Sequence, residues 1–146
     1  NLKTFRKNYL QWIEDIRSGS LLKRFPNETE TWVSDFGVAI IDFGGLNLQQ
    51  FFTEAATKLA ITNMNDLQRL HSHLSYGFII NANPLAHQLL NVAKPLMANL
   101  LERFEIHGTN SKKWMPALLR KIPRSQLPTA LGGFKDFKPV ATCDYI

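Results

Sequence analysis

Two short apolar runs constrain the fold of this chain more than any other feature. The first is VAIIDF at 38–43 and the second is GFIINA at 77–82, and both have apolar side chains at odd and even positions. A strand with this pattern is covered on both faces, as in a parallel sheet, whereas a half-exposed strand alternates. After each run, apolar residues recur at the spacing of a helix. The sequence therefore predicts an α/β domain with a mostly parallel β-sheet flanked by helices.

Helical periodicity predicts most of the remaining elements. Apolar residues from Leu2 to Ile16 recur at the spacing of an amphipathic helix over 2–17. Asn47 and Gln50 have the spacing of a helix cap and its capping-box partner. The helix that they begin is expected to bury Phe51, Phe52, Ala55, Ala56 and Leu59. The other expected elements are a helix over 64–74, a helix from Pro84 to about 101, a strand over 104–107 and a helix over about 112–120.

The helix that begins at Pro84 has two interpretations. Its apolar residues extend well around the helix: Leu85, Leu89, Leu90, Val92, Ala93, Leu96, Met97, Leu100 and Leu101. Such a helix covers the core on one side and meets something else apolar on another. One interpretation is a central core helix, and the other is a mobile lid over an apolar ligand or a surface that enters a membrane interface.

Composition and charge narrow the function classes. The 146 residues are 45% hydrophobic and 20% charged, which is typical of one globular domain. The net charge of +5 comes from residues 103–146, which have eight basic and three acidic side chains. A basic surface attracts anionic membranes or nucleic acids, but no nucleic-acid motif is present, and we expect no nucleic-acid partner. The single cysteine, Cys143, favours a reducing compartment.

The sequence does not predict an enzyme. Asp-Phe-Gly occurs at 35–37 and 42–44, but the lysine, catalytic loop and length of a protein kinase are missing. No GxSxG elbow or HExxH motif is present. His71 and His73 lack a third ligand at matching spacing, so we expect neither a metal nor a cofactor.

Three ordered segments carry a family resemblance. They are FGVAIIDFGGLNLQQFF at 36–52, GFIINANPLAHQLLNVAKPLMANLLERFEIHGTN at 77–110 and WMPALLRKIPRSQLPTALGG at 114–133. Together they resemble the CRAL-TRIO lipid-binding domains. In that family an apolar strand ends in Ile-Asn-x-Pro or close to it, a gate helix with a Lys-Pro motif follows, and a Leu-Pro-x-x-x-Gly-Gly segment closes the domain.

The resemblance implies a five-stranded sheet that floors an apolar pocket, closed by a gate helix at 84–101. The domain is then 1–133, with a C-terminal tail at 134–146 and with the family's N-terminal helical lobe missing. Such a domain holds one lipid without catalysis and transfers it between membranes, working in the cytoplasm with peripheral membrane contact. The alternative is a regulatory or membrane-recruitment domain of a larger protein that transfers nothing.

The resemblance also implies site residues. The pocket residues are Ile41, Phe43, Ile79, Leu89, Val92, Leu96 and Met97. Arg103 stands where the family places a basic residue that meets lipid phosphate, and Lys94 anchors the end of the gate helix. Ser72 and His73 stand where phosphatidylinositol carriers have a glutamate and an arginine. The expected ligand is therefore a phospholipid or, equally, a tocopherol- or retinoid-like molecule.

Basic side chains of the last third of the chain would meet anionic lipids at the membrane. They are Arg103, Lys112, Lys113, Arg120, Lys121 and Arg124.

Overall fold

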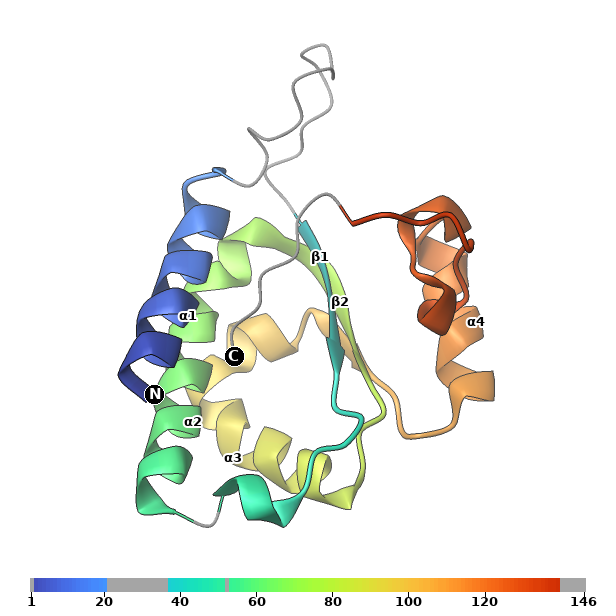
Figure 1. The fold of residues 1–146 in the computed structure, drawn as a ribbon. Coiled ribbons are helices and arrows are strands. Elements are labelled where there is room, and N and C mark those ends of the chain that lie inside the picture. The colour runs from blue at the N-terminus through green and yellow to red at the C-terminus, as the bar shows by residue number, and fades with distance from the viewer. Residues whose placement is uncertain (1, 21–36, 52, 140–146) are drawn as a thin grey trace.

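The computed structural model describes residues 2–20, 37–51 and 53–139, and Figure 1 shows their arrangement. The helices are α1 (Leu2–Arg17), α2 (Glu54–Leu67), α3 (Pro84–Leu101) and α4 (Ser111–Lys121). The strands are β1 (Gly37–Asp42), β2 (Leu74–Ile80) and β3 (Phe104–Ile106). The 3₁₀ helices are η2 (Leu48–Phe51), η3 (Gln68–His73), η4 (Arg124–Gln126) and η5 (Thr129–Leu131). Asp35, Phe36, Phe52, Cys143 and the end of the tail lie outside the described residues.

The strands form a three-stranded parallel sheet in the order β1-β2-β3. Helix α2 lies in the connection from β1 to β2, and α3 in the connection from β2 to β3. The register pairs Ile41 with Ile79 and Gly77 with Phe104. The predicted fold class, a parallel sheet flanked by helices, is confirmed. The described residues form three of the five strands that the family resemblance implies.

The chain enters β2 earlier than predicted. Helix α2 continues directly into η3, and β2 begins at Leu74, so the separate helix expected over 64–74 is wrong. Leu67, Leu70 and Leu74 have a spacing compatible with one helix face. Leu74 instead pairs with Gly37 in the sheet, while its side chain is buried in the same core cluster as Leu70. Tertiary packing therefore overrides the local periodicity.

The predicted capping box forms, but it caps a shorter element. The Asn47 amide N–H donates to Gln50 Oε1 at 3.1 Å, and the Gln49 amide donates to Asn47 Oδ1 at 3.0 Å. These bonds cap the 3₁₀ helix η2. Helix α2 has its own N-cap, because Thr53 Oγ1 accepts a hydrogen bond from the Ala56 amide at 3.1 Å. The helix expected after Asn47 is therefore two elements.

Helices cover both faces of the sheet, as Figure 1 shows, with α1, α2 and α3 on one side and α4 on the other. On the α4 side, Phe78 and Ile80 pack with Trp114 and Leu118. Coverage of both faces explains why the strand sequences are apolar at odd and even positions.

The opposite face is covered mainly by α1, α3 and η3. Ile13 of α1 is fully buried and shares a cluster with Leu70, Met97 and Leu100. Helix α3 spans the predicted residues, and it is kinked at Met97, where φ is −141° and ψ is 37°. Pro95 lies two residues earlier and lacks the amide N–H of a regular helical hydrogen bond, which accounts for a kink here.

The Gly-Gly pair at 132–133 directly follows η5. Gly132 has a φ of +89°, in the left-handed region that favours glycine. A Cβ added at Gly133 would lie 1.6 Å from the Leu127 carbonyl oxygen, so no side chain fits there. The left-handed backbone at Gly132 and the close packing at Gly133 therefore explain the two glycines that end the Leu-Pro-x-x-x-Gly-Gly segment.

Candidate functional site

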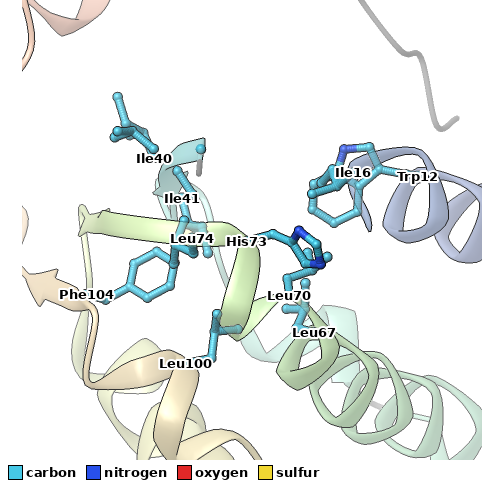
Figure 2. Close-up of a pocket in the computed structure, with 13 residues that line it drawn as sticks. Trp12, Ile16, Ile40, Ile41, Leu67, Leu70, His73, Leu74, Leu100 and Phe104 are labelled. Carbon is cyan, nitrogen blue, oxygen red and sulfur yellow. The ribbon is translucent and has the colours of Figure 1, made fainter. Parts of the chain in front are cut away.

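A cavity of about 390 Å³ lies beside β1, against α1 and η3. Figure 2 shows its lining, with the His73 ring directed toward the side chains of α1. The lining residues are Trp12, Ile16, Gly37, Val38, Ala39, Ile40, Ile41, Leu67, Leu70, His73, Leu74, Leu100 and Phe104. Its volume falls within the range of about 300–1,000 Å³ that is usual for small-molecule sites.

The lining is almost entirely apolar. Among the described lining residues, hydrogen-bonding side-chain atoms occur on His73 and Trp12, and no Lys, Arg, Asp or Glu is present. Such a surface binds a ligand through burial of apolar area. The chemistry of the cavity is therefore that of a site for a hydrophobic molecule.

Polar contacts hold the α1 wall against α2. The Arg6 guanidinium donates to Asn63 Oδ1 at 2.5 Å and forms an ion pair with the Asp66 carboxylate. The Tyr9 hydroxyl donates to the Asn63 carbonyl oxygen at 2.6 Å. Burial raises the pKa of Tyr9 well above its ordinary value, and the negative charge of Asp66 adds to the rise. These contacts place Trp12 and Ile16 over the cavity.

The predicted pocket residues of the sheet lie in or beside the cavity. Ile41 lines it directly. Phe43 and Ile79 belong to the adjacent cluster, where they pack with Ala86 and Leu90 of α3 and its neighbours. Ile41 is also packed against that cluster, so it connects the cavity with the contact between the sheet and α3.

The predicted pocket residues of α3 differ in burial, and they lie outside the described lining of the cavity. Met97 is buried in the cluster that contains Ile13, while Leu89 and Leu96 are half-buried. Val92 is 57% exposed. Leu100, in the last turn, is the α3 residue that lines the cavity among those described.

Sequence reasoning did not assign several lining residues to the site. They are Trp12, Ile16, Leu67, Leu70, Leu74, Leu100 and Phe104. The helical stripe of α1 indicated that Trp12 and Ile16 are covered, but a stripe does not show whether it faces a filled core or a cavity. No sequence signal distinguishes these two cases.

The three predicted head-group residues lie near one another but have different surroundings. His73 lines the cavity, whereas Ser72 is exposed. Arg103 Nη1 donates to the Leu74 carbonyl oxygen at 2.7 Å, which places the guanidinium beside the cavity wall. Within the described residues, Arg103 forms no ion pair with a carboxylate.

Other titratable groups lie away from the cavity. A hydrogen bond from Lys121 Nζ, at 2.5 Å, is the main cause that lowers the pKa of Glu105. His71 Nδ1 lies 3.1 Å from the Gln68 carbonyl oxygen. Across the described ranges, no group of three or more His, Cys, Asp or Glu side chains is placed to hold a metal ion.

The family model of the CRAL/TRIO domain matches residues 10–133. The match covers most of the chain, and the chain belongs to this family. A search of curated proteins finds no match. CRAL/TRIO domains are in general carriers of lipophilic ligands rather than enzymes, which agrees with the apolar lining of the cavity. No helix in the described ranges is both long enough and apolar enough to cross a membrane.

Proposed function

We propose that this chain binds one hydrophobic lipid in the cavity beside β1 and transfers or presents it between membranes. The observation that carries the proposal is the cavity of about 390 Å³ with its apolar lining. A ligand gains roughly 0.8 kcal/mol for each methylene that it buries in such a lining. An acyl or isoprenoid chain therefore binds through burial alone, without catalysis.

In this proposal α3 is the gate through which the ligand enters. Leu89 and Leu96 are half-buried, and movement of α3 would expose them, together with Met97, Phe43 and Ile79, to the ligand. The kink at Met97 provides a hinge at which the helix can bend. The exposed Val92 gives the outer side of the gate an apolar contact with the membrane.

Positive charge supports a role at anionic membranes. All of the basic side chains of the last third of the chain that were expected to meet lipids are exposed: Arg103, Lys112, Lys113, Arg120, Lys121 and Arg124. Each basic residue near an anionic surface contributes about 1 kcal/mol of attraction. In the proposal, the protein works in the cytoplasm. Arg103 meets lipid phosphate through its planar guanidinium, and Ser72 and His73 lie nearby. The lipid-binding domain covers 1–133, and 134–146 is a tail.

The test is mass spectrometry of the organic extract from natively purified protein. We expect one dominant lipid at a near-equal molar ratio to protein. Ala39 lines the cavity, so Ala39→Trp should fill it and remove the lipid, whereas Ala98→Trp places the same side chain at an exposed site of α3. An empty extract from folded wild-type protein would refute the proposal and favour an interaction domain that transfers nothing.

A further inference from the structure

His73 differs from His71 and His107 in its surroundings. It is the last residue of η3, it is half-buried, and its ring faces the cavity. His71 has the Gln68 carbonyl oxygen as a partner, and His107 Nε2 lies 3.4 Å from a Glu105 carboxylate oxygen. Neither ring nitrogen of His73 has a hydrogen-bond or ion-pair partner within the described part of the chain.

An unpartnered imidazole at an apolar cavity offers the ligand a specific contact. A neutral histidine ring has one nitrogen that donates and one that accepts a hydrogen bond. The indole N–H of Trp12 can only donate. Among the described lining side chains, His73 is therefore the one that can both donate and accept, which matches the hydrogen bonding of a hydroxyl group.

The charges around the cavity disfavour an anionic head group inside it. No described lining residue carries a permanent charge. Arg103 is bonded to the Leu74 carbonyl oxygen, and Arg69 lies 3.8 Å from the Glu14 carboxylate. A phosphate or carboxylate in this lining would lose its hydration without a fixed charge to compensate it.

We infer that His73 determines the ligand class of this cavity, selecting a lipid with one neutral hydroxyl at the end of an apolar body. The inference rests on the proposed function, since it requires that the cavity holds a ligand. The hydroxyl hydrogen-bonds to the imidazole of His73, and the apolar body packs against Leu70, Ile41 and Phe104. Arg103 then meets phosphates of the membrane surface rather than the cargo.

A competition among three probes with the same chain length tests this inference. Hexadecanol, hexadecanoate and hexadecane are offered together from cyclodextrin to the full chain, and the retained probes are extracted and measured by gas chromatography. His73→Phe keeps an aromatic ring and removes both nitrogens, and His71→Phe is the matched control outside the cavity. Comparing variant with wild type in one mixture cancels the differences in probe solubility.

We expect the wild type to prefer hexadecanol, and we expect His73→Phe to lower the ratio of retained alcohol to alkane about fivefold, as for one net hydrogen bond. His71→Phe should leave the ratio unchanged. His73→Gln, which keeps a donor and an acceptor, should preserve part of the preference. If His73→Phe fails to fold, the contrast between His73→Leu and His73→Gln takes its place.

The outcomes separate this inference from the proposed function. An unchanged ratio in His73→Phe overturns the role of His73, and a wild-type preference for hexadecanoate overturns the neutral head group. In both cases the cavity still binds a lipid. Folded wild-type protein that retains none of the three probes overturns the proposed function itself.

Discussion

Replacing Gly77 with alanine tests how the cavity wall is packed on the sheet. Gly77 lies in the central strand, and its partner Phe104 lines the cavity. A Cβ at Gly77 would lie 2.4 Å from Phe104 Cε1 and 2.7 Å from Cδ1. Carbon atoms in favourable contact are about 3.5–4.0 Å apart. The phenyl ring must therefore move by roughly 1 Å, and the adjacent cavity is where it has room.

The loss of folding stability in Gly77→Ala is the difference between two opposing effects. Overpacking of this kind destabilises a core by about 1–3 kcal/mol. Replacing a glycine whose backbone suits alanine restricts the unfolded chain and returns about 0.4–1 kcal/mol. We expect a net loss of about 1–2 kcal/mol, which lowers Tm by roughly 3–8 °C for a chain of this size. The displaced ring also occupies part of the cavity, so lipid retention should fall.

Calorimetry and lipid retention measure the two effects. Gly108→Ala is the control, because its added Cβ would have its nearest neighbour, the Ala82 carbonyl oxygen, at 3.9 Å. In Gly77→Ala with Phe104→Leu, the smaller side chain relieves the clash, so the double variant should lose less stability than the sum of the single variants. Strict additivity, or a Gly77→Ala variant with wild-type Tm and lipid content, would refute this packing.

Three further predictions concern other sites. Gly133→Ala should cost more than about 2 kcal/mol in urea denaturation, because the new Cβ meets the Leu127 backbone rather than a side chain that can move; an unchanged midpoint would contradict it. The folded state raises the pKa of Tyr9, so stability should fall as pH rises above the ordinary value of 10.0, where the unfolded phenol ionises first. Because Tyr9 is only partly buried, the fall should be at most about 1 kcal/mol, and Tyr9→Phe should remove it from urea midpoints measured across this pH range. Arg103→Ala should weaken binding of the folded protein to anionic phospholipid vesicles more than Arg120→Ala does, measured by vesicle co-sedimentation; equal binding by both variants would remove the phosphate contact assigned to Arg103.

Local chemistry in the sequence was sufficient to locate several elements. Pro84 occupies the first turn of α3, and the Asn83 side chain accepts a hydrogen bond from the Ala86 amide at 2.9 Å. Both features act within one helical turn, and therefore the start of α3 could be predicted. The apolar runs of β1 and β2 indicated burial on both faces in the same way.

The end of α2 and the lining of the cavity depend on the tertiary structure. Leu74 could continue a helix by its spacing, and it is a strand residue because Gly37 pairs with it across the sheet. Trp12 and Leu70 are far apart in the sequence and line one cavity because α1 and η3 meet beside β1. Hydrophobic patterning is a property of each segment and identifies the side that is covered. Whether that side meets close-packed atoms or a space for a ligand depends on contacts between segments, which only the folded chain determines.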